Sequence, residues 1–344
     1  MRYYRIEITD EKGKRIKDAA GNDIGPWDSD KNPLNESTRP GSPLQITLDA
    51  PTFGSDMLAG GAMLTVFGLP VSVLRQAVDL HLAHITVYGG FSAGLPLTNP
   101  PRKGILLKGQ IYGPYGNWQG VHQTLNLPVW PSNIIDDVGK PFTITMDGRQ
   151  GDKLSDVILR ALQVTYQNSA QKLEINVNIH QNLVLYEDWK AIFRSIFEMS
   201  QMLKRVTPGM LGQRIYSGVN IAVQKNKINV FDGSDGKQAK PIQARDLIGQ
   251  PTWLEPQRIS IKTSMRADIE VGDWITLPFD AIGENSILAV GNQMGQYSEK
   301  QRLSFSGTYE VMGMRHIGDY YNVAEDGWVT IFEAVPRLKD VVGT

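Results

Sequence analysis

The densest group of side chains that could bind a metal lies between residues 79 and 84, in the sequence Asp-Leu-His-Leu-Ala-His. His81 and His84 are three residues apart and would share one face of a helix, with Asp79 and His122 as possible further ligands. The chain has no His-Glu-x-x-His pattern, and its five histidines are scattered. The alternative is a helix end that runs into a strand, with His84 hydrogen-bonded at that point. The sequence favours this alternative and predicts no metal centre; His81 and His84 are the candidate ligands should one form.

Two other groups of residues could support hydrolysis. His316 and Asp319 are close in sequence, but a Ser/His/Asp site needs a serine on a strained turn, and no Gly-x-Ser-x-Gly is present. Gly318-Asp319 is better explained as a β-turn. Glu187 and Asp188 could form a glycosidase pair, although a helix N-terminus also favours acidic residues. With no Walker loop or Gly-x-Gly-x-x-Gly before a helix, we predict no catalytic residue, no cofactor and no enzymatic activity.

Composition narrows the class of protein. The 344 residues suggest two or three domains, and 41% hydrophobic with 21% charged residues is typical of a globular chain. A net charge of −1 argues against a broad nucleic-acid surface. The absence of cysteine excludes disulfides and thiolate metal sites. We expect no signal peptide and no membrane span, because the uncharged segment 57–74 contains Gly and Pro and is better explained by a strand followed by a helix start.

The elements that must position these side chains are mostly strands in the first part of the chain. Residues 1–135 show repeated alternation of apolar and polar residues, which predicts a first β region. A long loop is expected at 18–45, which is rich in Asp, Asn, Gly, Pro and Ser, and one short helix at 71–83.

The pattern changes at residues 136–210, where we predict a small α/β insert. A strand and a polar turn precede a helix with Asp152 as its N-cap. The segment 186–205 has apolar residues at helical spacing and predicts a second helix, ended by Thr207-Pro208-Gly209.

Alternation returns at residues 211–344 and predicts a second β region. The segment 214–232 indicates a hairpin that turns at Lys225-Asn226. The segment 251–278 is interpreted as two strands joined by Gly272-Asp273, with a Trp on each strand. The expected fold class is mainly β with an α+β insert: two β-barrels or sandwiches that flank a small α/β domain.

Aromatic residues are spread along these elements. Single aromatic residues on strands usually belong to a core, and the others can anchor interfaces. The candidates for barrel packing or interfaces are Trp118, Trp189, Trp253, Trp274 and Trp328.

Several short motifs, taken in order, resemble the baseplate hub proteins of tailed phages, of the Mu-like and contractile-tail type. After the 214–232 hairpin come Ile248-Gly249-Gln250-Pro251 and Ile269-Glu270-Val271-Gly272-Asp273. The last hairpin of that family is matched at Gly307, Val311, His316, Gly318, Asp319, Trp328 and Thr330. The segment 106–127 repeats the pattern of 304–335, with a Gly, an alternating strand, a turn and a Trp. Each motif alone is common, but the ordered set is not.

The resemblance implies a structural virion protein of the tail baseplate, assembled in the host cytoplasm. Each chain would carry two tail-tube-like barrels, and a homotrimer would present six of them. Such a trimer adapts the symmetry of a hexameric tail tube to a trimeric central spike. The implied partners are the spike, tube or tail-end ring proteins, the tape-measure protein and the baseplate wedge, with DNA only passing through the lumen.

Two alternatives come from other classes of protein. One is a virion-associated enzyme that degrades cell wall or glycan, with Glu187 or His81 in its site. The other is a receptor-binding or carbohydrate-binding tail protein. Activity on peptidoglycan or binding to a glycan array would distinguish these from a structural hub.

Overall fold

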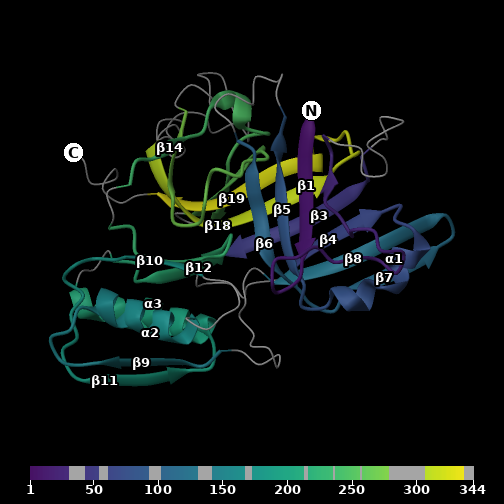
Figure 1. The fold of residues 1–344 in the computed structure, drawn as a ribbon. Coiled ribbons are helices and arrows are strands. Elements are labelled where there is room, and N and C mark those ends of the chain that lie inside the picture. The colour runs from purple at the N-terminus through teal and green to yellow at the C-terminus, as the bar shows by residue number, and fades with distance from the viewer. Residues whose placement is uncertain are drawn as a thin grey trace, which may run out of the picture.

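The computed structural model of the chain describes residues 1–30, 43–53, 61–92, 102–130, 142–166, 173–212, 216–234, 237–255, 258–278 and 307–336. These residues form one large sheet, two small sheets and a few helices (Figure 1). Parts of the expected loop at 18–45 and of the uncharged segment at 57–74 lie outside the described residues. Within the described ranges, the helices are too short or too polar to cross a bilayer.

The first β region is built from alternating strands, as predicted. In β1, for example, Tyr4, Ile6 and Ile8 are buried and their neighbours are more exposed. The helix expected at 71–83 is split into an α-helical turn and a 3₁₀ turn. The elements are β1 (Arg2–Thr9), β2 (Trp27–Asp28), β3 (Ile46–Phe53), β4 (Ala62–Phe67), α1 (Val71–Arg75), η1 (Ala77–Leu80), β5 (His84–Phe91), β6 (Gly104–Ile111), β7 (Tyr115–Gln119) and β8 (His122–Trp130).

The insert has three layers: a two-stranded ribbon, a pair of helices and a three-stranded sheet (Figure 1). The helices pack between the ribbon β9–β11 and the sheet β10–β13–β12 around a core of their own. The elements are β9 (Ile144–Gly148), α2 (Leu154–Tyr166), β10 (Glu174–Asn178), β11 (Trp189–Phe193), α3 (Ile196–Leu211), β12 (Asn220–Gln224) and β13 (Lys227–Phe231). The sequence predicted the hairpin β12–β13 as part of the second β region. In the structure, β10 pairs in parallel with the free edge of β13, so the hairpin belongs to the three-stranded sheet of the insert.

The helix predicted at 186–205 is wrong in both of its limits. Its first part is strand β11, which pairs with β9, and the helix begins only at Ile196. Ser195 is the N-cap and accepts a hydrogen bond from the backbone N–H of Glu198. The helix then continues through Pro208 and ends before Gly212, which has the left-handed conformation that a C-terminal cap requires.

The predicted N-cap of the first insert helix is also wrong. Helix α2 begins at Leu154, and the carboxylate of Asp152 accepts a hydrogen bond from the backbone N–H of Arg149 instead. Asp152 therefore closes the turn before the helix.

The second β region differs from its prediction in how its strands pair. The strands of segment 251–278 are not one hairpin: β16 pairs with β15 and β19, whereas β17 pairs with β14 and β18. Gly272-Asp273 is a turn that leads into β17. The elements are β14 (Lys240–Pro241), η3 (Ala244–Asp246), β15 (Thr252–Glu255), β16 (Arg258–Ser264), β17 (Trp274–Leu277), β18 (Gly307–Asp319), η5 (Glu325–Gly327) and β19 (Trp328–Pro336).

Strand β18 joins the two β regions. Along one edge, Gly307–Glu310 pairs with β17 and Gly313–Asp319 pairs with β3, while the other edge pairs with β19. Thirteen residues of strand span about 40 Å, which is long enough to serve both regions. The hydrogen-bonded order of the described strands runs openly from β15 to β2, with β14, β17 and β7 as branches. The mainly β class with a small α-containing insert is confirmed, but the two β regions form one open sheet in the described residues rather than two closed barrels.

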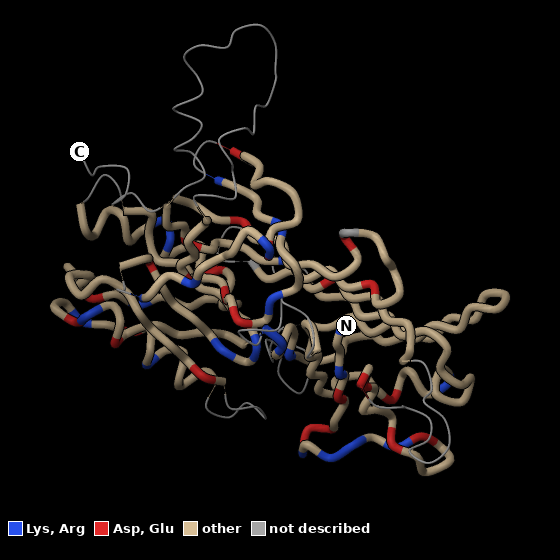
Figure 2. The backbone as a smooth tube through the Cα atoms, turned by 90° about the horizontal axis from the view of Figure 1, so that it is seen from above, with Lys and Arg blue, Asp and Glu red and all other residues tan. Residues whose placement is uncertain are grey.

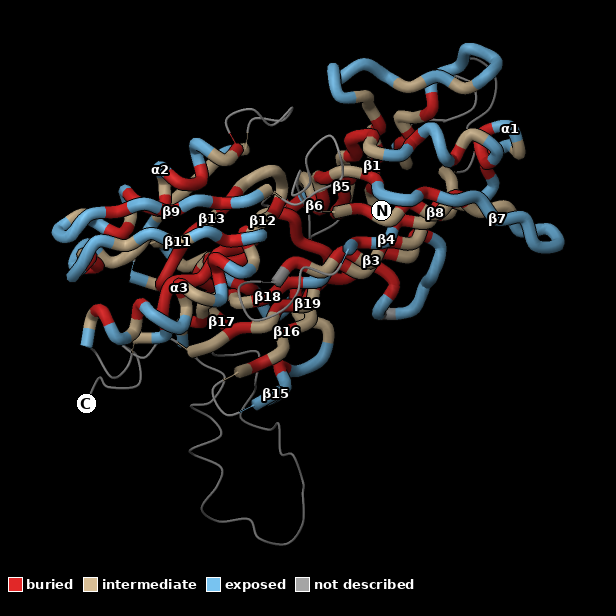
Figure 3. The backbone as a smooth tube through the Cα atoms, turned by 90° about the horizontal axis from the view of Figure 1, so that it is seen from below, coloured by how far each residue is buried: buried red, intermediate tan, exposed pale blue. Residues whose placement is uncertain are grey.

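Buried side chains form three clusters, one in each β region and one in the insert. Figure 3 marks the buried residues along the backbone of these parts. The cluster of the first β region also contains Met265, Ala267 and Trp328 from the second. The two β regions therefore share a core as well as a sheet.

Candidate functional site

The histidines predicted as weak metal ligands have separate surroundings. His81 accepts a hydrogen bond through Nδ1 from the backbone N–H of Gly113, at 3.2 Å, and its ring lies against Tyr112. His84 is buried at the start of β5, and burial lowers the pKa of its imidazole. His122 is exposed at the start of β8. Among the described residues, no three His, Cys, Asp or Glu side chains come together in a way that could hold a metal ion.

His316 is fully buried on β18 and is held by a neighbouring strand. Its Nδ1 lies 2.9 Å from the hydroxyl of Thr330 on β19. Burial, and to a smaller extent the charge of Lys225, lower the pKa of His316 to about 3. The ring is therefore neutral near neutral pH and is packed inside the sheet.

The β-turn predicted at Gly318-Asp319 is wrong, because both residues belong to β18. Gly318 lies directly under the ring of Trp328, and an added Cβ would come within 2.8 Å of that ring. The side chain of Asp319 accepts a hydrogen bond from the Gln45 amide at 2.6 Å. His316 and Asp319 thus stabilise strand pairing separately.

The carboxylates Glu187 and Asp188 precede a strand, not a helix. Asp188 accepts a hydrogen bond from the backbone N–H of Gln150 at 2.9 Å, and Glu187 is exposed. The helix dipole therefore does not explain these two acidic residues.

One of the sequence motifs, Ile269–Asp273, lies within residues 265–273, which we call the junction loop. Side chains from the first and the second half of this loop enter different cores. Met265 and Ala267 belong to the core of the first β region, and Ile269 and Val271 to that of the second. The junction loop therefore holds the two cores in a fixed relation.

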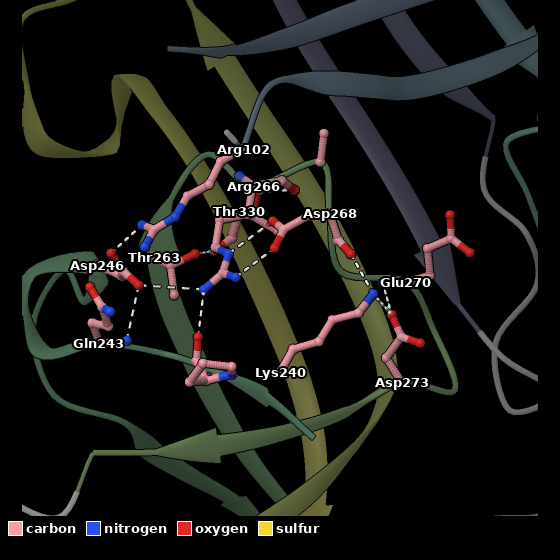
Figure 4. A network of polar contacts seen from close by, with 12 residues as sticks. Arg102, Lys240, Gln243, Asp246, Thr263, Arg266, Asp268, Glu270, Asp273 and Thr330 are labelled. Carbon is pink, nitrogen blue, oxygen red and sulfur yellow. Dashed lines mark hydrogen bonds and ion pairs between the residues drawn. The ribbon is translucent and has the colours of Figure 1, made fainter. Parts of the chain in front are cut away.

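A network of buried charges surrounds the junction loop (Figure 4). Asp246 is fully buried and forms ion pairs with Arg102 of the first β region and with Arg266 of the junction loop. The Arg102 and Arg266 side chains are only 2% and 3% exposed. Arg266 also binds Asp268 through two hydrogen bonds of 3.0 and 2.6 Å. Burial acts to raise the pKa of Asp268, but the hydrogen bonds and charge of Arg266 outweigh it, and the pKa is lowered.

The turn at the end of the junction loop depends on Gly272 and Asp273. Gly272 has φ +89° and donates its N–H to the carbonyl of Val311 on β18 at 2.8 Å. The Asp273 carboxylate accepts the N–H of Glu270 at 2.7 Å and an ion pair from Lys240 at 2.6 Å. The turn thereby connects the junction loop to both β18 and β14.

The insert contacts the junction loop through the tip of hairpin β12–β13. Lys225 and Asn226 both have positive φ, as a tight two-residue hairpin turn requires, and this confirms the predicted turn. Gln224 donates to the carbonyl of Val271 and accepts from its N–H. The ammonium group of Lys225 pairs with Glu270 at 3.2 Å, and its pKa is lowered by burial, which Glu270 partly opposes.

Two further contacts fasten the last hairpin to the first β region. The indole N–H of Trp328 donates to the carbonyl of Gly90 on β5 at 2.8 Å. The guanidinium of Arg2 on β1 donates to the carbonyls of Asp319 and Tyr320 at 2.9 and 3.1 Å, and to others in the same turn. The C-terminal hairpin is therefore held by side chains as well as by strand pairing.

The five candidate Trp residues have different environments. Trp274 and Trp328 are buried in cores, and Trp189 is partly buried against the insert core. Trp118 on β7 is 65% exposed, and Trp253 on β15 is 45% exposed. The structure thus separates packing positions from exposed positions, a distinction that the sequence pattern did not make.

Comparisons with known proteins give structural but not sequence matches. No family model matches the chain, and no curated protein matches it. Among solved structures, the E. coli c3393 protein is described as a type VI secretion component similar to the T4 bacteriophage tail proteins gp27 and gp5. It is 10% identical with a TM-score of 0.47, and the match covers 86% of this chain and 74% of that one.

Two further structures are tail proteins. The tail protein from Neisseria meningitidis MC58 is 10% identical with a TM-score of 0.47, covering 98% of this chain and 97% of its own. The 43 kDa tail protein of prophage MuSo2 from Shewanella oneidensis is 7% identical with a TM-score of 0.46, covering 86% and 98%.

Proposed function

We propose that the chain is a structural hub component of a phage-type tail baseplate. The observation that carries the proposal is where the hub-like motif residues lie. Gly272 and Asp273 form the turn of the junction loop and bind the backbone of Val311 on β18. His316 contacts Thr330 within the C-terminal hairpin, and Trp328 holds that hairpin to Gly90 on β5. The motif residues therefore fix the turn and the hairpin of the second β region, and Trp328 joins that hairpin to the first β region.

This arrangement suits an assembly role for a physical reason. Two β regions that share a sheet, a core and a buried charge network present their outer surfaces in one fixed relation. Three such chains in a ring would present six related β regions, which can contact a six-fold tube on one side and a three-fold spike on the other. The proposed role is a homotrimeric symmetry adapter that requires no catalytic group and no cofactor.

The proposed partners follow from that role. They are a second and third copy of the chain, the trimeric spike, the tail tube or its last ring, and the tape-measure and wedge proteins. DNA would only pass through the ring, and the proposed location is the tail baseplate of the virion.

Mass photometry of the purified chain, alone and mixed with spike and tube proteins of the same tail, tests the proposal. A trimer of three 38.2 kDa chains would appear at about 115 kDa, alone or on addition of the spike. Electron micrographs of that species should show six similar lobes in a ring. A chain that stays monomeric in every mixture refutes the proposal.

A further inference from the structure

The junction loop passes from one strand of the C-terminal hairpin β18–β19 to the other. The strand before the loop, β16, pairs with β19, and the strand after it, β17, pairs with β18. At the start of the loop, the backbone N–H of Arg266 donates to the hydroxyl of Thr330 on β19 at 3.0 Å, and Figure 4 shows these two residues side by side. At its end, Gly272 donates to the carbonyl of Val311 on β18. The loop is therefore fastened to both strands of the hairpin.

His316 lies directly beside the first of these contacts. It is opposite Thr330 in the strand pairing, and its Nδ1 is 2.9 Å from the same hydroxyl that binds Arg266. The His316 side chain is 0% exposed, and its Nε2 has no hydrogen-bond partner among the described residues. A single hydroxyl group thus links a buried imidazole to the backbone of the junction loop.

A second proton on this imidazole has no acceptor in the closed structure. Whichever nitrogen carries the proton of the neutral ring, the imidazolium has an N–H at both positions. The Nδ1–H can donate to the Thr330 hydroxyl, but the Nε2–H faces no described acceptor. A buried charge without hydrogen bonds is costly, because nothing replaces its hydration. The ring therefore gains a proton most easily when this face of the hairpin opens to water.

The charge nearest in effect to His316 opposes a further cation. Figure 2 marks the charged residues along the backbone, and Lys225, at the tip of hairpin β12–β13, is the one that adds to the effect of burial in lowering the pKa of His316. The carboxylate that pairs with Lys225 is Glu270, at 3.2 Å. On the neighbouring strands, Ala50 of β3 and Thr330 of β19 lie opposite His316 and do not titrate.

The carboxylates that the junction loop brings to this side are paired with another residue. Arg266, which contacts Thr330 through its backbone, forms ion pairs with Asp246 at 3.4 Å and with Asp268 at 2.6 Å. Both carboxylates therefore compensate the guanidinium of Arg266. An imidazolium at His316 would add a cation to a region whose described acidic groups are already engaged.

The insert is stabilised separately from this region. Its described core contains no residue of the junction loop or of the C-terminal hairpin. It meets the junction loop through Gln224, which bonds the backbone of Val271, and through Lys225. Opening of the junction loop removes these contacts and leaves the core of the insert complete.

We propose that His316 is an acid-sensitive latch, at which uptake of a proton opens the junction loop from the C-terminal hairpin while the insert stays folded. The pKa of His316 is about 3 in the closed structure, against 6.5 for an exposed imidazole. Between these two values the open form holds a proton that the closed form does not, so its population rises about tenfold for each unit of falling pH. From pH 7 to 4.5 the rise is on the order of a hundredfold. The latch does not depend on the proposed hub function.

Hydrogen–deuterium exchange of the full chain at pH 7 and 4.5 tests the proposal, with every peptide corrected for its intrinsic exchange rate. Protection of peptides from the junction loop should fall about a hundredfold. At pH 4.5, peptides from helix α3 of the insert should remain at least about tenfold better protected than those of the junction loop. Equal protection of the two regions at pH 4.5 would mean that the chain opens as a whole, and an unchanged junction loop would mean that it does not open. Either result overturns the proposal, and neither needs a variant.

Two variants identify the group that titrates. His316→Gln can still hydrogen-bond to Thr330 but cannot take up a proton, so the fall in junction protection between pH 7 and 4.5 should nearly disappear. His84→Gln is the matched control, because His84 is also buried and its ring nitrogens have no partner among the described residues, but it lies on β5. This control should keep the hundredfold fall. A fall that persists in His316→Gln, or disappears in His84→Gln, shows that another group is responsible and overturns the proposal. Circular dichroism at pH 7 checks that both variants are folded.

Discussion

The buried ion pairs of Asp246 make a quantitative prediction about the junction. Asp246→Asn removes one negative charge with little change in shape, and the new amide oxygen can still accept the N–H of Gln243, which the carboxylate accepts at 2.9 Å. The substitution leaves Arg102 without its carboxylate and Arg266 with Asp268 alone.

The expected cost follows from burial. Removing one partner from a buried ion pair typically costs about 3–5 kcal/mol, because the remaining charge is left without compensation. Asp246, Arg102 and Arg266 are 0–3% exposed, so water cannot replace the lost partner. For a chain of 344 residues that unfolds as one unit, this corresponds to a fall in Tm of about 4–7 °C.

The assay is thermal and urea unfolding followed by tryptophan fluorescence, which the buried Trp274 and Trp328 should report. The matched control is Asp49→Asn, which breaks the surface pair of Asp49 with Arg315. Its side chains are 45% and 48% exposed, so the expected loss is below about 1 kcal/mol.

A double variant separates loss of charge balance from loss of contact. Adding Arg102→Met to Asp246→Asn removes one uncompensated cation. The double variant should therefore have a free energy of unfolding about 1–3 kcal/mol higher than Asp246→Asn alone. An Asp246→Asn variant as stable as Asp49→Asn, or a double variant whose losses simply add, would refute the reasoning.

Three further predictions concern the same region. Folded His316 has a pKa of about 3 against 6.5 when unfolded, so stability is lost as the pH falls from about 6.5 towards 3. Between pH 7 and 4.5, the free energy of unfolding of the parent should fall by about 2–3 kcal/mol more than that of the His316→Gln variant, as measured by urea titrations. An equal fall in the two proteins would contradict this. Gly272→Ala should lower the free energy of unfolding more than Gly151→Ala. Both glycines have φ near +90°, but only at Gly272 would the new Cβ lie 3.0 Å from a ring, that of Phe231; equal urea midpoints would contradict this. Trp328→Phe should lower the free energy of unfolding by about 1–3 kcal/mol, because the Gly90 carbonyl loses its buried donor; an unchanged urea midpoint would show that this bond is unimportant.

Local patterns predicted the strands well because their causes are local. The two-residue period of β1 and the Lys225-Asn226 turn need only neighbouring residues to be recognised. The helix predicted at 186–205 failed because apolar spacing within β11 happens to match a helix too. A signal for the true start was present, since Ser195 and Glu198 form the usual Ser-x-x-Glu pattern of a helix N-terminus.

The junction could not be predicted from local patterns because its contacts are remote in sequence. Arg102 and Asp246 are 144 residues apart, and Trp328 and Gly90 are 238 apart. An Arg in a Pro-rich segment and an Asp in a 3₁₀ turn are usually surface residues, so neither indicates burial. The ordered motifs marked the C-terminal hairpin, but they gave no indication that this hairpin would contact the first β region.

The charged residues around the junction loop restrict how the two β regions can be arranged. Four cations and four anions lie around the junction loop: Arg102, Lys225, Lys240, Arg266, Asp246, Asp268, Glu270 and Asp273. Buried ion pairs add little stability compared with well-packed apolar residues, because desolvation offsets their attraction. They do penalise any arrangement that separates the partners. Apolar faces alone could slide past each other, so we interpret the network as the feature that permits a single orientation of the two β regions.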